Sequence, residues 1–220
     1  MVHIPQSGYL VMLELSIDDE TVLINFEEAE VNDPSPCKVD GDRVIYISRQ
    51  LRVRGSVGRP VLCDFGKARI GDKEFDDDIQ PYLYRAPEVI LQIPWNNKAD
   101  IWNLGVMVWD LAQSRHLLEA QDANNECSNA RHLAEMIARL GSPPKSFLQR
   151  SKVITKIFDI NGNWKGDVEI PSLSLEELEE NLEGVDKTLF LQFMRTMLRW
   201  VPEERKSALE LLEDPWLNSR

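Results

Sequence analysis

The sequence predicts a mainly α-helical protein with a small β region near its start. From residue 86 onward, helical patterns follow one another, separated by caps and proline stops. Before that point the β-rich segments are few and short, and read GYLVMLELS, RVIYIS and GRPVLCDF. Strands and helices do not alternate along the chain, so we expect no doubly wound parallel sheet.

The composition narrows the class of partner. Of the 220 residues, 43% are hydrophobic and 28% are charged, as in an ordinary globular protein. The net charge of −12 argues against nucleic acid as a partner, because phosphate binding requires a basic surface. An acidic surface can attract a protein or a basic peptide, although on charge alone a role in solubility is the preferred interpretation. No apolar run reaches the ~20 residues of a membrane helix, and the N-terminus has no signal-peptide pattern, so we expect no membrane partner.

The cysteines predict that the protein lies in a reducing compartment, and the spacing of cysteines and histidines predicts that it has no zinc site. Cys37, Cys63 and Cys127 lie far apart and are odd in number. Reduced thiols of this kind indicate a cytoplasmic or nuclear protein. No cysteine or histidine pair has the spacing of zinc ligands.

Two of the helices are predicted from apolar patterns. Asp100 is expected to cap residues 101–112, which are apolar nearly all round and therefore form a buried helix. The stretch 130–141 has an apolar face that ends at Gly141. The residues of that face are Leu133, Met136, Ile137 and Leu140.

Three more helices follow toward the C-terminus. Ser174 with Glu177 forms a capping box, and Ser207 with Glu210 forms a second one before a last short helix. Between them, residues 188–200 form an amphipathic pattern that stops near Pro202.

The first 42 residues give a weaker prediction. The acidic stretches IDDE and FEEAE are assigned to no element, and Asp18 and Asp19 are expected on the surface of a hairpin. Residues 31–42 are rich in proline, aspartate and glycine and are predicted to form a loop.

Four short motifs occur in a meaningful order. The tripeptide Asp64-Phe65-Gly66 follows an apolar run, and alone it would be a weak signal. Three further motifs come after it, and their main residues are Tyr84, Arg85 and Glu88 of YRAPE, Asp100, Trp102 and Gly105 of DIWNLG, and Arg205 of PEERKSA.

This ordered set resembles the C-terminal half of a eukaryotic protein kinase. Within that family, DDIQPYLYRAPEVIL and the ending MLRWVPEERKSALELLEDPWLNS resemble the SR-protein kinases, in the CMGC group of serine/threonine kinases. The resemblance covers about residues 15–220 and leaves residues 1–14 as a divergent extension. It implies a protein-kinase-like C-lobe and ATP-dependent phosphorylation of Arg/Ser-rich proteins.

The resemblance also implies roles for these residues. Asp64 would bind the Mg²⁺ that bridges the phosphates of ATP, and the carboxylate suits that hard cation. Phe65 and Gly66 would shape the same nucleotide site, with Gly66 permitting a sharp turn. Glu88 would pair with Arg205, in a buried pair that is costly to break from one side.

The remaining residues of these motifs are expected to have structural roles and to take no part in catalysis. Asp100 would hold backbone near the catalytic loop from the start of a central helix. Tyr84, Arg85, Trp102 and Gly105 belong to the same structural set.

The rest of a kinase nucleotide site is not found in this sequence. There is no Gly-x-Gly-x-x-Gly and no Val-Ala-x-Lys, and only about 60 residues precede Asp64, so we expect the N-lobe to be absent. The position of the catalytic loop reads QSGYLVM, without the His-x-Asp and without the lysine and asparagine that follow it. We therefore expect no intact catalytic residue and no productive binding of Mg-ATP by this chain.

The segment after Asp64 departs from the family in two ways. Pro81 stands where the family has threonine. No serine or threonine lies between Gly66 and Arg85, which excludes ordering by Ser/Thr phosphorylation. The acidic run DKEFDDD (72–78) either replaces phosphate charge or is a solvated loop, and both interpretations are open.

A third departure concerns substrate docking. In the family, a groove near the helix at 130–141 presents acidic residues to the basic substrate. This chain has Arg131 and Ala138 at two of those positions.

Three interpretations of function follow. The chain belongs with the serine/threonine kinases by descent; or it is a pseudokinase C-lobe that binds proteins; or it is a truncated or mis-spliced product that folds poorly. The helical core is complete from the buried helix to Arg205, so we expect it to fold.

Overall fold

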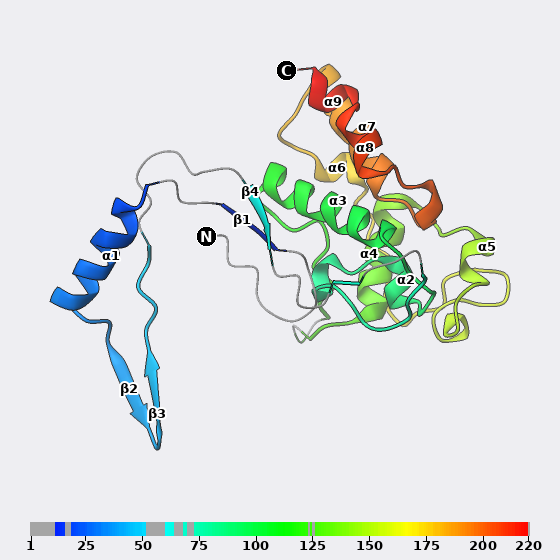
Figure 1. Cartoon of the computed structure of the whole chain (residues 1–220). Coiled ribbons are helices and arrows are strands. Elements are labelled where there is room, and N and C mark those ends of the chain that lie inside the picture. Colours follow the sequence, from blue (N-terminus) through cyan, green and yellow to red (C-terminus); the bar gives the residue numbers. More distant parts are fainter. Residues whose placement is uncertain are drawn as a thin grey trace. The chain divides into compact units, whose positions relative to one another are not determined.

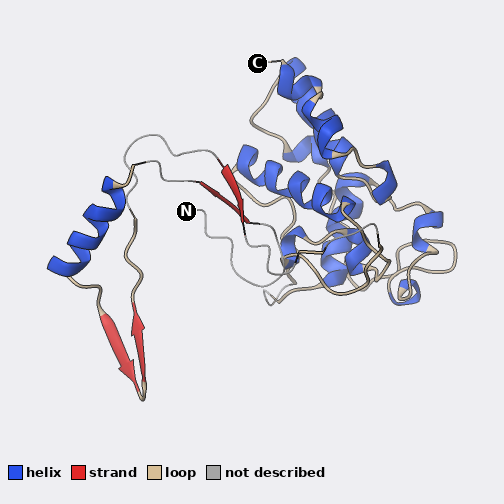
Figure 2. Cartoon of the chain, viewed as in Figure 1, coloured by secondary structure: helices blue, strands red, loops and turns tan. Residues whose placement is uncertain are grey.

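The structure is a computed structural model that describes residues 12–15, 19–51, 60–63, 68–69, 73–122, 124 and 126–219. The chain forms two compact units, one made of Met1–Ile4 with Val11–Ala68 and the other of Pro5–Leu10 with Arg69–Arg220. Figure 2 shows that helices dominate, and among the described residues all strands lie in the first unit. The predicted fold class, mainly α with a small β region, is confirmed. The division at residue 14/15 stays a prediction.

The first unit is built on one pair of strands with a long insertion. Strand β1 (Met12–Leu15) pairs antiparallel with β4 (Pro60–Cys63), with Met12 opposite Cys63. Antiparallel neighbours are commonly joined by 2–5 residues, roughly. Residues 16–59 are therefore an insertion between two paired strands, and its described part, residues 19–51, is called the inserted arm below.

The inserted arm contains one helix and one hairpin (Figure 1). Helix α1 spans Thr21–Asn32, and strands β2 (Cys37–Asp40) and β3 (Arg43–Tyr46) pair antiparallel across a turn at Gly41, whose φ is +60°. Two sequence predictions need correction here. The stretch FEEAE, which was assigned to no element, lies within α1, and the predicted loop at 31–42 holds the end of α1 and all of β2.

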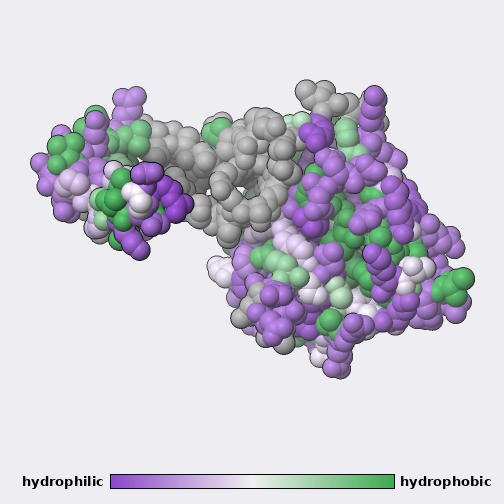
Figure 3. Space-filling view, turned by 90° about the horizontal axis from the view of Figure 1, so that it is seen from below, coloured by the Kyte–Doolittle hydropathy of each residue, from purple (hydrophilic) through white to green (hydrophobic). Residues whose placement is uncertain are grey.

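The surface of the inserted arm carries apolar side chains. Figure 3 shows green patches among the purple ones on this part of the chain. Of the residues of α1, only Val22 is buried. Exposed large apolar residues of the arm are Leu23, Ile24, Val31, Val39, Val44, Ile45, Tyr46 and Ile47. The arm therefore has little core of its own.

The second unit is helical. Its central element is α3 (Lys98–Gln113), which packs against α7 (Gly184–Met197), and α7 packs in turn against α9 (Pro215–Asn218). The other α-helices are α2 (Pro87–Ile90), α4 (Asn129–Leu140), α5 (Lys145–Leu148), α6 (Leu175–Leu178) and α8 (Ala208–Leu212). Single 3₁₀ turns lie at Tyr82–Tyr84, Ile154–Lys156 and Pro202–Glu204. None of the helices among the described residues has both the length and the apolar character to cross a membrane.

Most predicted helix ends are found in the structure. Both capping boxes form, with Ser174 accepting from the Glu177 backbone and Ser207 from the Glu210 backbone. Gly141 ends α4 with a φ of +79°. Helix α7 stops earlier than the pattern predicted, at Met197.

The second unit has a packed core. Large side chains with less than 2% exposure are Trp102, Trp109, Phe147, Phe158, Phe190, Leu91, Leu118, Leu133, Met136, Leu148 and Leu175. The charged side chain of Arg205 is also fully buried in this core. A buried guanidinium needs a negatively charged or hydrogen-bonding partner, because burial of an unpaired charge is costly.

Candidate functional site

The predicted nucleotide-binding residues fall outside the described part of the chain. Strand β4 ends at Cys63, immediately before Asp64. Asp64, Phe65 and Gly66 themselves lie outside the described residues, so their roles stay predictions. After these residues the structure describes residues 68–69 and then the chain from residue 73.

Residues 73–95 form a segment that folds back on itself. Phe75 and Trp95 exchange two backbone hydrogen bonds of 2.9 and 2.8 Å, and their rings lie 5.0 Å apart. The indole N–H of Trp95 also donates to the carbonyl of Asp77 at 2.8 Å. These contacts tie the two ends of the segment together.

Three consecutive aspartates of this segment each form an ion pair, and one of the three bases, Arg85, belongs to the segment itself. Asp76 accepts from Lys152 Nζ at 3.3 Å and Asp77 from Arg69 Nη2 at 2.7 Å, and the Asp78 carboxylate forms an ion pair with Arg85 Nη2 at 3.2 Å. The bases come from three separate stretches of the chain. The three aspartate side chains are 71%, 45% and 74% exposed, as in a solvated loop, so both interpretations of the acidic run stay predictions.

Gln80 is a buried polar residue that the sequence did not single out. Its backbone has a φ of +70°, which is unusual outside glycine, and the residue is 1% exposed. Its side chain donates to the carbonyl of Ala99 and accepts from the N–H of Ala86, both at 2.8 Å. It therefore joins YRAPE to the start of α3. No local pattern signals this role, because both partners are backbone groups.

Tyr84 and Arg85 are both held by polar contacts. The Tyr84 hydroxyl donates to Asp110 Oδ2 at 2.7 Å, and burial with this hydrogen bond raises the pKa of Tyr84. Asp110, on α3, also contacts His116 Nδ1 at 2.6 Å. Arg85 Nε donates to the carbonyl of Ile79 at 3.2 Å. Asp110 was missed at the sequence level, since a single acid in an apolar helix gives no partner.

Glu88 and Arg205 form the buried ion pair that the motifs predicted. Two parallel hydrogen bonds of 2.6 Å join the carboxylate to Arg205 Nη1 and Nη2, and neither side chain is exposed. Arg205 also donates to the carbonyls of Lys98 and Arg199 at 2.8 and 3.0 Å. Its guanidinium carbon lies 5.3 Å from the Trp102 ring centre. Four hydrogen bonds and the Trp102 ring therefore surround the guanidinium, and a buried charge requires such partners.

Gly105 lies where α3 meets the end of α7. A Cβ atom at this position would lie 3.0 Å from both Met197 Cβ and Leu198 Cδ2. The absence of a side chain therefore lets the two helices approach closely.

The predicted capping role of Asp100 is wrong. Helix α3 begins at Lys98, with Asn97 as the preceding cap residue, and the Asn96 side chain accepts from the Lys98 N–H at 2.9 Å. Asp100 lies in the first turn with its surface exposed, and desolvation by neighbouring groups raises its pKa. An acid in the first turn is favourable through the helix dipole, so the residue suits its position without being the cap.

The described geometry agrees with sequence comparisons. Residues 54–217 match the family model described as the protein kinase domain. The chain belongs to the protein kinase domain family. The segment 73–95 is therefore the kinase segment that follows Asp-Phe-Gly.

Relatives include serine/threonine kinases from several organisms. A serine/threonine protein kinase of Aspergillus fumigatus is 50% identical over 202 residues, which cover 90% of this chain and 51% of the relative. The probable serine/threonine-protein kinase sky1 of Dictyostelium discoideum is 32% identical over 169 residues, covering 72% of this chain and 25% of the relative. SRSF protein kinase 3 of Mus musculus is 31% identical over 165 residues, covering 71% and 28%. The chain thus spans about half the length of the first relative and about a quarter of the other two.

The inserted arm is shared at least in part with the Aspergillus fumigatus kinase. The tenth of this chain that the match leaves out is shorter than residues 19–51. The kinase family model, by contrast, begins only at residue 54. The match to the kinase family therefore leaves the inserted arm uncovered.

Helix α4 carries Arg131, the basic residue that the sequence indicated. Arg131 Nε donates to Glu135 Oε1 at 2.9 Å, and Glu135 is 2% exposed and also accepts from the N–H groups of Glu119 and Ala120. Arg131 is thus neutralised within its own helix. Ala138 lies about two turns after Arg131 on the same helix and is partly exposed.

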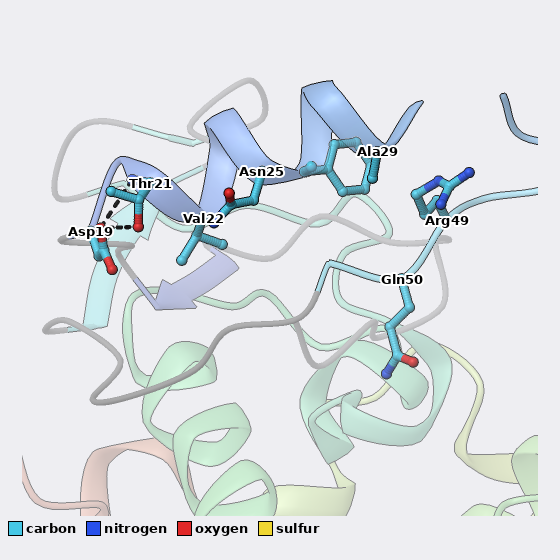
Figure 4. A pocket seen from close by; sticks show the side chains of 8 residues that line it. Asp19, Thr21, Val22, Asn25, Ala29, Arg49 and Gln50 are labelled. Carbon is cyan, nitrogen blue, oxygen red and sulfur yellow. Dashed lines mark hydrogen bonds between the residues drawn. The ribbon is translucent and has the colours of Figure 1, made fainter. Parts of the chain in front are cut away.

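An open pocket of about 710 Å³ lies on the inserted arm. Figure 4 shows Val22 and Asn25 of α1 on one side and Arg49 and Gln50 on the returning segment. Asp19 accepts hydrogen bonds from the backbone and hydroxyl of Thr21, which lower its pKa. We interpret the pocket as the open space beside the partly buried face of α1.

Proposed function

We propose that this chain is part of a serine/threonine protein kinase of the SR-protein-kinase type, which phosphorylates Arg/Ser-rich proteins. The observation that carries this proposal is the ordered segment from residue 73 to Glu88. In protein kinases this segment must be in place for activity, and it is commonly ordered by phosphorylation. Here Asp76, Asp77 and Asp78 form ion pairs at the surface, and the buried Glu88–Arg205 pair anchors the end of the segment.

The substrate class is proposed from the relatives and from charge. One relative is named for SRSF proteins. A net charge of −12 favours encounter with a basic partner. The neutralised Arg131 on α4 means that any acidic docking surface must use other residues than that position.

We also propose that these 220 residues by themselves transfer no phosphate. Kinase catalysis depends on positioning ATP, metal and hydroxyl, with an aspartate to orient the nucleophile. The printed sequence contains no phosphate loop, no ATP-anchoring lysine and no His-x-Asp. Loss of several such parts together typically removes many orders of magnitude in rate.

The residues present do not complete a Mg-ATP site. Asp64 supplies one carboxylate of the kind that Mg²⁺ prefers. Among the described residues, no group of three or more acidic, histidine or cysteine side chains is placed to hold a metal ion. No catalytic step through Mg-ATP is therefore derived for this chain.

A second function, as a protein-binding module, is favoured by the same ordered segment. A helical unit with a complete core can present residues 73–95 to a peptide without catalysing a reaction. Nucleotide binding is not needed for such a role. The proposed partner is a protein or a basic peptide.

Phosphate transfer from radiolabelled ATP to an Arg-Ser-rich peptide tests catalysis, with the Asp64→Ala variant as control. We expect no transfer and a melting temperature that Mg-ATP leaves unchanged. Activity that the Asp64→Ala change abolishes would overturn the proposal of inactivity.

Fluorescence anisotropy with the same peptide tests binding. A Lys-Gly peptide of equal charge is the matched control. Tighter binding of the Arg-Ser peptide supports the substrate class, whereas equal binding of both peptides contradicts it.

A further inference from the structure

A carboxylate latch holds the two ends of the inserted arm's hairpin region together. Glu30 Oε1 accepts from the backbone N–H of Ser35 at 2.6 Å. Glu30 Oε2 accepts from the Ser35 hydroxyl at 2.8 Å and from Arg49 Nε at 2.7 Å. These hydrogen bonds lower the pKa of Glu30, those from Ser35 most strongly. The latch thus joins the last turn of α1, the linker to β2 and the segment after β3.

Ser35 occupies an unusual place in this latch. It lies in the stretch Asp33-Pro34-Ser35-Pro36, outside helix and strand, with both prolines exposed. Pro36 has no backbone N–H. An enzyme that modifies Ser35 therefore has to bind the chain without a hydrogen bond from the backbone of residue 36. Prolines on both sides also restrict the backbone, which lowers the entropy lost on binding in an extended enzyme groove.

We propose that Ser35 is a phosphorylation site for a proline-directed protein kinase, and that phosphate at Ser35 takes Arg49 from Glu30. In the reaction, Ser35 Oγ forms a bond to the γ-phosphorus of ATP as the bond to the bridging oxygen of ADP breaks. The hydroxyl proton passes to the base of that kinase, and ADP leaves. The co-reactants are ATP and the modifying enzyme.

The change in charge rearranges the latch. The Ser35 hydroxyl loses the proton that it donates to Glu30, and a group of charge about −1.5 to −2 arises beside a carboxylate. Glu30 and the phosphate then repel each other, and both compete for the same guanidinium. A phosphate has three strong acceptor oxygens, so Arg49 moves to it, and Glu30 is released. Asp33, whose carboxylate lies 3.6 Å from Arg49 Nη2, is repelled in the same way.

The chain contains an internal control for this proposal. It has one other Ser-Pro dipeptide, Ser142-Pro143, and no Thr-Pro. Ser142 is exposed, but Pro143 is buried beside it. A proline-directed kinase must contact the proline side chain, which is accessible at Pro36 and buried at Pro143. The structure therefore predicts modification of Ser35 and not of Ser142.

Phosphorylation of the folded 220-residue chain tests the site. The probe is a purified cyclin-dependent kinase with ATP, and mass spectrometry maps the modified residues. We expect phosphate on Ser35 and not on Ser142 in the folded chain, loss of that phosphate in Pro36→Ala and Ser35→Ala, and modification of both serines in urea-unfolded chain diluted into the assay. Absence of phosphate on Ser35, or equal modification of Ser142 in the folded chain, overturns the proposal.

Titration of the phosphoserine by ³¹P NMR tests the transfer of Arg49. An adjacent guanidinium favours the dianion and lowers the second pKa of the phosphate, which is ordinarily about 6. We expect the Arg49→Gln variant to titrate at a higher pH than the otherwise unchanged chain, and the Glu30→Gln variant at a lower one. Equal titration of the unchanged chain and Arg49→Gln would show that Arg49 does not move to the phosphate.

Discussion

The Glu88–Arg205 pair in the helical unit and the Glu30–Arg49 pair on the inserted arm have the same chemistry and opposite surroundings. The first is joined by two hydrogen bonds, with both side chains at 0% exposure. The second is joined by one, with side-chain exposures of 36% and 25%. Water screens the second pair and competes for its hydrogen bonds, whereas nothing replaces a lost partner of the first. Surroundings, and not residue type, therefore determine how much each pair contributes to stability.

The same contrast runs through the two regions. The helical unit buries large aromatic side chains, and its polar groups are joined across distant segments. The inserted arm leaves most of its apolar residues exposed, and its hairpin has only two strands. A two-stranded hairpin is marginally stable in water by itself. The helical unit is therefore suited to hold a fixed surface, and the arm to change its contacts.

The largest effect is expected from Arg205→Ala. It leaves Glu88 charged, buried and without its two hydrogen bonds, at a cost of about 3–5 kcal/mol in the free energy of unfolding. Urea denaturation measures it. The matched control is Arg150→Ala, because Arg150 also makes two hydrogen bonds to a carboxylate, that of Glu203, but with both side chains exposed. Similar losses in the two variants would refute the dependence on burial.

A second expectation concerns acid stability through His132. This residue of α4 is fully buried, its two ring nitrogens have no hydrogen-bond partner among the described residues, and the Tyr82 ring lies 5.6 Å away. Burial, with a smaller contribution from the nearby Arg85, lowers the pKa of His132 to about 3. The unfolded chain therefore binds a proton that the folded chain does not between pH 6.5 and 3. Stability is present above pH 6.5 and is lost as the pH falls toward 3.

The His132→Leu variant measures this effect. From pH 7 to pH 5 the wild type should lose roughly 2 kcal/mol through this residue, which the variant should not lose. His116→Gln, at an exposed position, is the control. If the wild type and His132→Leu show parallel pH profiles, His132 does not limit acid stability.

Gly105→Ala is expected to have a smaller effect. The added methyl group lies 3.0 Å from two side-chain atoms at the end of α7, and overpacking of this kind costs about 1–3 kcal/mol. The higher helix propensity of alanine offsets about 1 kcal/mol of that. A thermal melt beside Leu111→Ala, on the exposed side of the same helix, measures the net loss. A stabilised Gly105→Ala variant would show that α3 and α7 are less closely packed.

The helical unit was largely predictable because its signals are local. Ser174 and Ser207 with their glutamates set two helix starts, and Gly141 set one helix end. The Glu88–Arg205 pair followed from resemblance alone, since 117 residues separate its members. Gln80 was not predictable, because its partners are backbone atoms brought close only by the fold.

The inserted arm was poorly predicted for a physical reason. Apolar residues lie around most of α1, so no single face signals a helix. For the hairpin a signal was present: Gly41-Asp42 connects the paired residues Asp40 and Arg43, and a Gly-Asp dipeptide between two such strands commonly forms a two-residue turn. The neighbouring prolines, Pro34 and Pro36, indicated a loop instead. The ends of α1 and β2 are therefore set by the fold around them and not by a local sequence signal.

The smallest effect is expected from Glu30→Gln. It removes the charge of the latch but keeps an amide oxygen that can accept from Ser35. Because Glu30 and Arg49 are in contact with water, the melting temperature of the helical unit should stay within the error of the measurement. The change should instead be local, and faster trypsin cleavage after Arg49 in the variant would report it. Cleavage should also become faster in the wild type at high salt, which screens the pair. A loss of stability comparable with that of Arg205→Ala would mean that the arm is part of the core, and the contrast between the two ion pairs would fail.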